Sequence, residues 1–369
     1  MTLMYVTPHP LRGPTLPTRP QALLEALVAT GAFDTIVAVN RVRPDAWWHR
    51  SRAGASNAGA VRMVEHGWPF GRLERRALGR LVRSLPPPLV CWIADPKSAP
   101  VLADLPAGAI GVLDAYDAWD RSPLVRGGRR RRAVVAGYRA AGAHADLIFA
   151  NTPTMADRLR GFGGRDVRVL PNAAPIPVRV TADRESSLIY VGRIHERFSC
   201  ALVAAAADAL PHVAIRILGP VERRPAGWDD LIARANVRTG PPLPWPAARE
   251  AIGRSHGLLV PHLPDEYTRS QDAMKAWDAL SVGAPVLSTS VPPADAWGPE
   301  LAIIADDPEG FTAGARRLVA GDLDPGREAR LAFAAANSWQ ARATSVVDAI
   351  QDVTAGIVPP DAIVTEAPR

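Results

Sequence analysis

The sequence predicts an α/β protein of two domains, each built on a parallel β-sheet with helices on both faces. Three observations support this fold class. The 369 residues favour two domains over one. Short apolar strands alternate with helical stretches along most of the chain. A Pro-rich segment, Pro171–Pro177, interrupts that alternation near the middle and is typical of a stiff connector.

The first domain is predicted over residues 1–176. Its strands are short apolar runs, and its helices carry apolar residues at helical spacing. Gly31 is a typical helix stop after the first helix. The expected strands are 3–6, 35–39, 89–93, 110–113, 147–150 and 167–170, and the expected helices are 20–30, 72–83 and 129–143.

The second domain is predicted over residues 187–337, after a polar stretch at 181–186. A last helix over 338–358, with Ser338 as its N-cap, is expected to pack back toward the first domain. The strands expected in the second domain are 188–191, 214–218, 237–240, 257–260 and 285–289, and the helices are 201–210, 228–235, 246–254 and one beginning near Asp272.

Several function classes are disfavoured by the sequence. The formal charge of +6 is basic, but no aromatic-basic RNA-binding motif and no Cys/His zinc spacing accompany it, so we expect no nucleic-acid partner. Neither a G-x-G-x-x-G fingerprint nor a P-loop is present, which disfavours a nicotinamide enzyme and a P-loop kinase. The acidic pair Asp306–Asp307 lies in a late loop, and we expect no obligatory metal and no cofactor.

Cysteine use and hydropathy predict a soluble cytoplasmic protein. Cys91 and Cys200 lie in or beside apolar runs, which favours buried free thiols and a reducing compartment. The N-terminus lacks a signal-peptide core, and no apolar run approaches the roughly 20 residues of a membrane span. The Arg-rich helix over 72–83 is typical of a helix covering a sheet; peripheral contact with the anionic inner face of a membrane is the alternative. The sequence does not indicate an oligomeric state.

The segment Asp272–Thr289 is the most informative, because it reads as a helix, a Gly stop and a buried strand. Lys275 is one of two lysines in an Arg-rich chain, which favours a site that wants a compact ammonium. Asp278 follows on the same helical face, so the pair can hold a phosphate and a ribose hydroxyl. Ser270 is a candidate N-cap, and free amides at the helix start can receive a phosphate. Taken alone, a weak surface pair is the simpler interpretation.

The loop after the strand at 188–191 contains further candidates for anion binding. Gly192 permits a tight turn and a close approach of the backbone to a ligand. Arg193 and Arg197 can neutralise a diphosphate. The alternative is a strand-end turn with solvated arginines, and it is the preferred interpretation for Arg197 taken alone.

These motifs occur in an order that resembles a known family. The segment Ala273–Leu287 resembles the donor-binding signature Pro-x-Lys-x-x-Glu-Tyr-Leu-Ala-x-Gly-x-Pro-Val-Val of two-domain, B-type nucleotide-sugar glycosyltransferases, like those of families 1 and 4. Tyr190–Ile194 and Ile217–Pro220 are similar to the strands that open that family's second domain. Ala145–Thr152 and Val169–Asn172 are similar to the end of its first. The resemblance covers most of 145–290.

The resemblance implies two Rossmann-like doubly wound domains facing a central cleft (GT-B). It implies transfer of a sugar from a nucleoside diphosphate sugar to the hydroxyl of a glycan, a lipid-linked glycan or a small metabolite. Lys275 would contact the diphosphate, and Asp278 stands where the family has a ribose-binding Glu, which is one methylene longer. The other implied donor-binding residues are Gly13, Gly192, Arg193, Arg197, Gly219, Gly240, Thr268, Arg269, Ser270 and Met274.

Other parts of the resemblance leave alternatives open. Retaining members carry another acid where this chain has Ser270, so neither retention nor inversion is inferred. The loop Gly240–Trp245 is similar to the region that receives the nucleobase, and a stiff surface turn is an equal alternative. A sugar-nucleotide epimerase of the same fold and a non-catalytic nucleotide-sugar binding protein are the alternative functions.

A general base is expected at the carboxyl ends of the first-domain strands, where a carboxylate can take a proton from an attacking hydroxyl. Asp117 is the first candidate, followed by Asp114 and then Asp95. Each of the three is also a typical cap or loop residue. Trp47–Trp48 can line an acceptor cavity or pack under a loop.

Overall fold

The computed structural model describes residues 1–356 except 9–10, 12–17, 42–60, 67–70, 124 and 126. These residues form two compact units. The first contains the described residues up to Pro171 and those from Gln340 onward, and the second runs from Asn172 to Trp339. The division falls earlier than the boundary predicted at 177–186, because the backbone of Asn172 is already hydrogen-bonded to Asp272 of the second unit.

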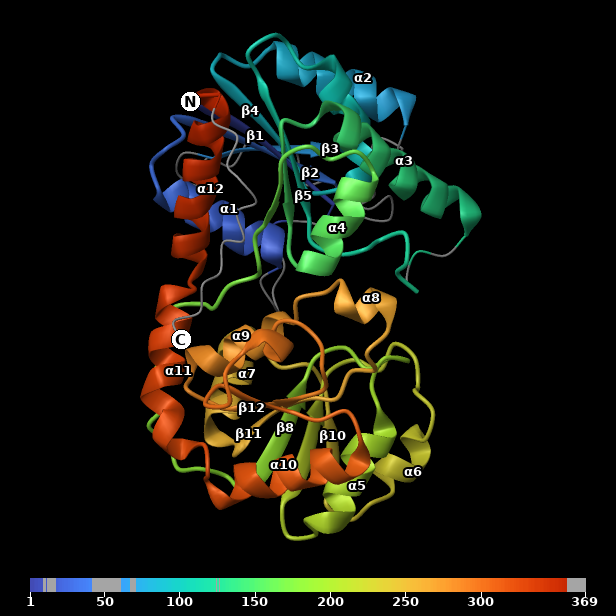
Figure 1. Cartoon of the computed structure of the whole chain (residues 1–369), viewed down its shortest axis with the longest axis vertical. Coiled ribbons are helices and arrows are strands. Elements are labelled where there is room, and N and C mark those ends of the chain that lie inside the picture. Colours follow the sequence, from blue (N-terminus) through green and yellow to red (C-terminus); the bar gives the residue numbers. More distant parts are fainter. Residues whose placement is uncertain are drawn as a thin grey trace. The chain divides into compact units, whose positions relative to one another are not determined.

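The first unit is built on a parallel sheet whose described strands have the order β3-β2-β1-β4-β5-β6-β7 (Figure 1). The chain starts at the centre with β1, winds outward to β3, and then continues in the other direction from β4. The central strands β1 and β4 are buried along their whole length, as expected for strands covered on both faces. The strands are β1 (Thr2–Thr7), β2 (Thr35–Arg41), β3 (Val61–His66), β4 (Leu89–Ile93), β5 (Ile110–Ala115), β6 (Leu147–Ala150) and β7 (Val167–Val169).

Helices lie on both sides of this first sheet, with α1 and α12 on one side and α3 and α4 on the other (Figure 1). The helix α12 is tied to the last strand by an ion pair between Arg168 and Asp352 at 2.8 Å. The helices are α1 (Arg19–Ala29), α2 (Arg72–Arg83), the 3-10 helix η2 (Pro96–Asp104), α3 (Gly128–His144), α4 (Pro153–Gly161) and α12 (Trp339–Thr354).

The second unit repeats the same winding on a parallel sheet with the order β10-β9-β8-β11-β12-β13 among its described strands. The strands are β8 (Ser187–Val191), β9 (Ala214–Leu218), β10 (Val237–Gly240), β11 (Gly257–Val260), β12 (Val286–Ser288) and β13 (Ala302–Ile304). The helices are α5 (Cys200–Ala209), α6 (Trp228–Ile232), α7 (Trp245–Arg254), α8 (Glu266–Arg269), α9 (Met274–Ser281), η3 (Ala294–Ala296), α10 (Pro308–Ala320), η4 (Asp324–Gly326) and α11 (Arg327–Ala336).

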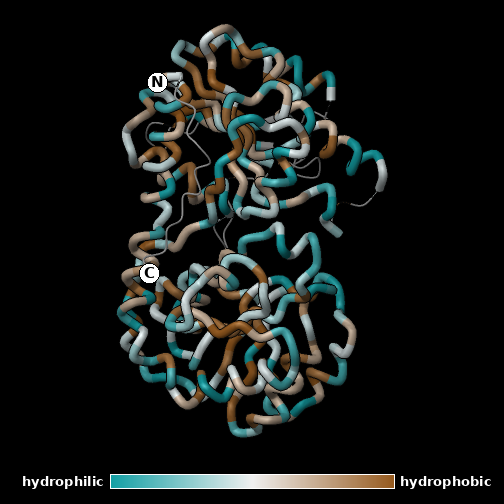
Figure 2. The backbone as a smooth tube through the Cα atoms, viewed as in Figure 1, coloured by the Kyte–Doolittle hydropathy of each residue, from teal (hydrophilic) through white to brown (hydrophobic). Residues whose placement is uncertain are grey.

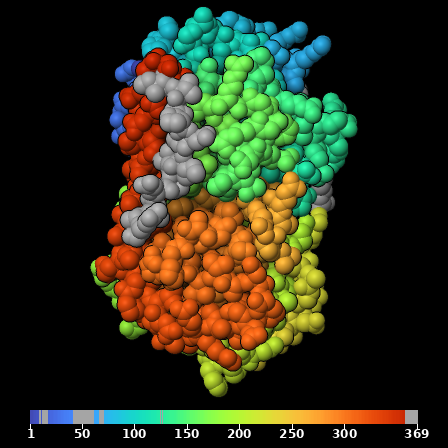
Figure 3. Space-filling model, viewed as in Figure 1, coloured from blue at the N-terminus to red at the C-terminus, as the bar shows by residue number. Residues whose placement is uncertain are grey.

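Two apolar layers fill the two faces of the second sheet. One layer contains residues of α7, α9 and α11, and the other contains residues of α5, α6 and α10. Hydrophobic residues, in brown, are found in the interior of the unit, and hydrophilic residues, in teal, are common on its outside (Figure 2). On the face turned to the viewer, the orange chain from α9 to α10 covers the sheet (Figure 3). The inner strands β8, β11 and β12 are buried along their whole length, so a ligand can reach polar groups of these strands only at their ends.

Both cysteines are buried free thiols, as predicted. Burial raises the pKa of Cys91 to about 12 and that of Cys200 to about 11, so neither thiol is reactive at neutral pH. None of the helices in the described part of the chain is long and apolar enough to cross a membrane.

Candidate active site

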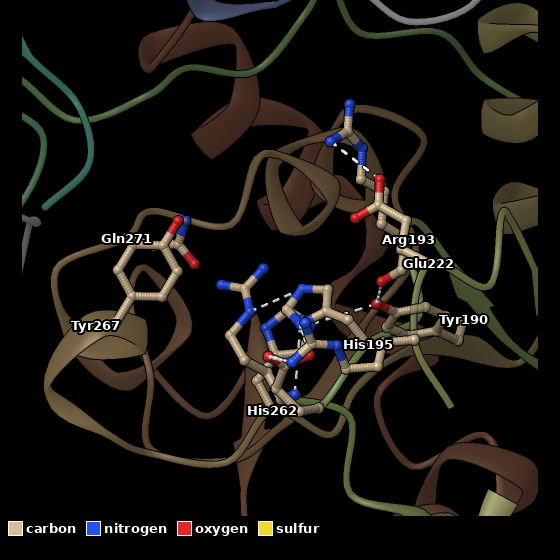
Figure 4. Close-up of polar contacts among 10 residues, drawn as sticks. Tyr190, Arg193, His195, Glu222, His262, Tyr267 and Gln271 are labelled. Atoms are coloured by element: carbon tan, nitrogen blue, oxygen red, sulfur yellow. Dashed lines mark hydrogen bonds and ion pairs between the residues drawn. The ribbon is translucent and has the colours of Figure 1, made fainter. Parts of the chain in front are cut away.

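The most unusual cluster of charges lies at the carboxyl edge of the second sheet, the edge where its parallel strands end. Strands β8 and β11 are neighbours in the sheet, although the chain leaves them in opposite directions. Ligands of open α/β sheets bind at such a topological switch point. The loop after β8 contributes Arg193, His195 and Arg197, and the loop after β11 contributes His262 (Figure 4).

Three glycines end three neighbouring strands at this edge and leave room for a ligand. Gly192 and Gly219 have φ of 144° and 147°, which L side chains rarely adopt. A Cβ on Gly219 would lie 2.0 Å from the carbonyl oxygen of Gly192, and a Cβ on Gly192 would lie 2.5 Å from Nζ of Lys275. Gly240, at the end of β10, accepts a hydrogen bond from the amide of Gly219 at 3.1 Å. The predicted glycines therefore lie together, and Lys275 can reach the strand ends only because Gly192 has no side chain.

Lys275 lies in the first turn of α9 with its ammonium over the ring of Tyr190, 3.9 Å from the ring centroid. Within the described residues no carboxylate lies within ion-pair distance of this ammonium. Burial lowers the pKa of Lys275 well below its usual value, and the nearby Arg197 lowers it further. The weak surface pair between Lys275 and Asp278 is therefore the wrong interpretation, because Lys275 is partly buried against Tyr190 and makes no ion pair with the carboxylate.

Two neutral histidines and Arg197 complete the basic cluster. Nε of Arg197 donates to Nε2 of His195 at 3.0 Å, and the guanidinium lies 5.4 Å from the ring centroid of Tyr267. Burial, followed by the charge of Arg197, lowers the pKa of His195 to about 4. Burial and then Lys275 hold the pKa of His262 well below its usual range. Both rings are therefore neutral at physiological pH, while Lys275 and Arg197 have no carboxylate partner in the described part of the chain, an arrangement that favours anion binding.

The structure reverses the predicted ranking of the two arginines. Arg193 is 66% exposed and is paired with Glu222 at 3.2 Å, away from the histidines (Figure 4). Arg197, for which a solvated position was the preferred interpretation, instead packs against Tyr267 beside Lys275. The chain turns back on itself after β8, so the second arginine reaches the cluster and the first does not.

Asp278 lies one turn after Lys275 on α9 and accepts a hydrogen bond at Oδ1 from the indole of Trp245 at 3.1 Å. Burial raises the pKa of Asp278 to about 6, and the indole, Arg249 and Lys275 act in the opposite direction. The guanidinium of Arg249 lies over the Trp245 ring, 5.0 Å from its centroid. The loop that ends at Trp245 therefore contacts the candidate ribose-binding carboxylate directly.

The predicted role of Ser270 as the N-cap of the Lys275 helix is wrong. Ser270 ends α8, and its hydroxyl donates to the carbonyl of Tyr267 at 2.6 Å. Helix α9 begins only at Met274, and its N-cap Ala273 has no capping side chain. Asp272 is also outside the helix, and its carboxylate accepts from the amide of Asn172 at 2.8 Å and from the indole of Trp277 at 2.7 Å.

The two remaining donor-site candidates in this segment, Thr268 and Arg269, lie on the short helix α8. Thr268 is buried, and its amide donates to the capping carboxylate of Asp265 at 2.6 Å. Arg269 is exposed. Their contact with a donor stays a prediction, as it does for Met274 at the first position of α9.

The three candidate bases lie toward the carboxyl edge of the first sheet: Asp95 follows β4, Asp114 is the last residue but one of β5, and Asp117 follows β5. Asp114 is fully buried and bonded to the equally buried Arg19, with Nη2 to Oδ1 at 2.7 Å, an arrangement that favours a structural role. Asp95 caps η2 by accepting from the amide of Lys97 at 3.0 Å. Asp117 is half-buried in the loop after β5, where its carbonyl accepts from the hydroxyl of Tyr138 at 2.8 Å.

Some predicted residues are not covered by the structure. Gly13 and the pair Trp47–Trp48 lie outside the described residues. Among the residues that are described, no group of three or more His, Cys, Asp or Glu side chains could hold a metal ion.

Sequence reasoning gave no role to His195, His262 and Tyr267. A usable signal was present for His262, since it follows the central strand β11 by two residues, at the switch point of the sheet. No local pattern indicated that Tyr267 would support the guanidinium of Arg197.

No protein-family model and no curated protein match the chain. Its structure matches HepE from Anabaena, solved in complex with UDP, at 14% identity and a TM-score of 0.65, over 95% of this chain and 99% of that one. It matches sucrose-phosphate synthase from Thermosynechococcus elongatus at 14% identity and a TM-score of 0.71, over 96% and 99%. It also matches AviGT4, a glycosyltransferase involved in avilamycin A biosynthesis, at 17% identity and a TM-score of 0.61, over 96% and 98%. The chain therefore has the GT-B fold of two Rossmann-like domains, as the sequence predicted.

Proposed function

We propose that this protein is a glycosyltransferase that transfers a sugar from a nucleoside diphosphate sugar to an acceptor hydroxyl. One observation carries the proposal: at the switch point of the second sheet, Lys275 and Arg197 lie beside glycine-lined strand ends, and no carboxylate of the described residues pairs with either. A diphosphate supplies the negative charge that this cluster lacks. HepE, which shares the fold, has been solved with UDP.

The proposed chemical role of Lys275 and Arg197 is to stabilise the leaving nucleoside diphosphate. When the bond between the sugar and the diphosphate breaks, negative charge develops on the diphosphate oxygens. Preorganised cations in a partly dry site stabilise such charge strongly, because little solvent has to reorganise. Lys275 and Arg197 are the residues in this position, and we propose that they act without an obligatory metal.

The acceptor hydroxyl must lose a proton as it attacks. We propose that a carboxylate at the carboxyl edge of the first sheet accepts this proton as a general base. Asp117 is our first choice, because Asp114 is bonded to Arg19 and Asp95 caps a helix. The nucleobase, the sugar and the class of acceptor are properties that the exposed loops of the two units would determine.

We also propose a cytoplasmic location, which two buried free thiols favour. Peripheral contact with an anionic membrane is a further prediction. It is supported by the outward face of α2, which exposes Arg72, Leu73, Arg76 and Arg80.

The proposal is tested by thermal shift with UDP, GDP and dTDP on the wild type, Lys275→Ala and Arg224→Ala. Arg224 is the matched control, since it is an exposed cation of the same unit that pairs with Asp229. At least one nucleotide should raise the melting temperature of the wild type and of Arg224→Ala, and the shift should be lost in Lys275→Ala. If no nucleotide shifts the wild type, the proposal is wrong.

A second assay separates the transferase from its two alternatives. Incubation of the nucleotide sugar that binds should release nucleoside diphosphate only when an acceptor is present. Conversion of the sugar while it is still attached to the nucleotide would indicate an epimerase. Binding without turnover across a panel of glycan, lipid-linked and small-metabolite acceptors would indicate a non-catalytic binding protein.

A further inference from the structure

Trp245 is held rigidly at the start of α7. It is the first residue of that helix and has a proline on each side, Pro244 and Pro246, which restricts its backbone. One turn later, Arg249 places its guanidinium over the indole, 5.0 Å from the ring centroid. Arg249 is itself anchored, because Nη2 donates to the carbonyl of Ile176 at 2.7 Å. The direction of the indole N–H is therefore determined before any ligand arrives.

The indole N–H points at one oxygen of Asp278 and leaves the other free. Nε1 of Trp245 donates to Oδ1 at 3.1 Å. Within the described residues, Oδ2 of Asp278 accepts no hydrogen bond. An ionised carboxylate offers about four lone-pair sites, so most of the accepting capacity of Asp278 is unused. The neighbouring cations Lys275 and Arg249 favour the ionised, accepting form.

A hydrogen bond to one carboxylate oxygen orients the other. The terminal torsion of an Asp side chain is broad, so an unrestrained carboxylate samples many orientations of its plane. A bond from a rigid indole narrows that range and directs Oδ2 to one place. A ribose presents two hydroxyl donors on adjacent carbons, and both can be accepted by a carboxylate fixed in this way.

We propose that Trp245 is a positioning residue that fixes the carboxylate of Asp278 to accept the ribose hydroxyls of the donor, and so makes the site selective for ribonucleotides over 2′-deoxyribonucleotides. This inference rests on the proposed function. It explains how the shorter Asp serves at this position, because the indole supplies the orientation that the side chain alone does not.

The test is the ratio of two dissociation constants, measured by calorimetry for each of UDP, GDP and ADP and for its 2′-deoxy counterpart. The wild type should bind the preferred ribonucleotide roughly tenfold or more tightly than its deoxy form, the factor expected for one hydrogen bond to a charged group. Trp245→Phe keeps an aromatic ring but removes the N–H donor. In this variant the ribonucleotide should bind more weakly, and the preference for the ribonucleotide over its 2′-deoxy form should fall toward one. The affinity for the 2′-deoxy form should fall less than that for the ribonucleotide, because the deoxy form has only its 3′-hydroxyl contact to lose.

A second variant and a control separate positioning from folding. Asp278→Asn keeps an oxygen for the indole and loses the charge, so it should also lose the preference for ribose. Trp297→Phe is the matched control, because Trp297 is a half-buried tryptophan of the same unit with its ring 5.0 Å from that of Trp277. This control should keep the wild-type ratio.

Each outcome has one meaning. Absence of binding of every one of these nucleotides to the wild type overturns the inference, and it refutes the proposed function when the thermal shift with dTDP is absent as well. Binding without a preference for the ribonucleotide shows that Asp278 does not accept the 2′-hydroxyl and overturns the inference while the proposed function stands. A preference that survives in Trp245→Phe shows that the indole only packs α7 against α9, and it also overturns the inference.

Discussion

Replacing Asp278 by Asn is expected to stabilise the ligand-free protein at neutral pH. Burial raises the pKa of this carboxyl from its ordinary value of 3.8 to about 6. Each pKa unit corresponds to about 1.4 kcal/mol, so holding Asp278 ionised in the folded state costs about 3 kcal/mol at neutral pH. Asn has the same shape, carries no charge, and its carbonyl oxygen can still accept from the indole of Trp245.

The difference in stability between the wild type and Asp278→Asn should depend on pH. Between pH 4 and pH 6 the folded wild type binds more protons than the unfolded chain, because the folded pKa is the higher one. The stability that Asp278 contributes in its protonated form is therefore lost as the pH rises through this window, and the loss is complete above pH 6. The advantage of Asp278→Asn should grow across the window and then stay constant.

The measurement is the midpoint of urea unfolding for the wild type and Asp278→Asn, followed by circular dichroism from pH 4.5 to pH 8. The two proteins should be close in stability at the acidic end, and the variant should be the more stable above pH 6. A difference that does not vary with pH, or a variant that is less stable at pH 8, would refute the assignment of a buried, ionised carboxylate to this position.

Four further predictions follow from the same edge of the sheet. Binding of the diphosphate should raise the pKa of Lys275, so calorimetry in buffers of different ionisation enthalpy should show proton uptake that Lys275→Arg abolishes, because a guanidinium keeps its charge and does not titrate. Gly192→Ala should weaken nucleotide binding at least tenfold, because the added Cβ would lie 2.5 Å from Nζ of Lys275. Gly219→Ala should lower the melting temperature by several degrees, because its Cβ would lie 2.0 Å from a backbone oxygen at φ of 147°. Arg197→Ala should weaken nucleotide binding, whereas Arg193→Ala should have little effect, since Arg193 is exposed and paired with Glu222.

Controls for these predictions exist in the same chain. Gly161→Ala adds a Cβ that meets nothing within 4 Å, at the end of α4, and should leave the melting temperature nearly unchanged. Proton uptake that persists in Lys275→Arg would assign the titrating group elsewhere. Equal losses of affinity in the two arginine variants would contradict the placement of Arg197 beside the ammonium.

The sequence predicted those strands best that are short, apolar and buried on both faces. The ranges of β4, β6, β10 and β11 agree with the prediction at both ends, because turn-forming or polar residues bound each run. Strand β3 was not predicted, since it mixes charged and apolar residues at the end of the sheet. Helix α4 was also missed, although the pair Thr152–Pro153 is a helix start, with the Thr hydroxyl accepting from the amide of Met155 at 3.1 Å.

The candidate site was predictable where its residues are local in sequence and not elsewhere. The residues of the Lys275 segment that predict anion binding all lie within one helix and the turn that follows it. The contact between Trp245 and Asp278 spans 33 residues, and no periodicity in the sequence indicates it. The positions of Arg193 and Arg197 depend on how the loop after β8 folds against α8, and Arg193 is held outside by Glu222 from another loop. The sequence therefore predicted which residue types belong to the site and their order along the chain, but it did not predict contacts between residues far apart in the chain.

The charges at the two carboxyl edges are balanced differently, and this difference bears on turnover. In the first unit two basic side chains pair with candidate bases, Arg19 with Asp114 and Lys97 with Asp95, whereas Lys275 and Arg197 in the second have no acidic partner among the described residues. A free nucleoside diphosphate has an unsubstituted terminal phosphate and therefore carries more negative charge than the sugar-linked form. Uncompensated cations attract the more highly charged species more strongly. The product should therefore bind more tightly than the donor, and its departure should set the pace of the catalytic cycle.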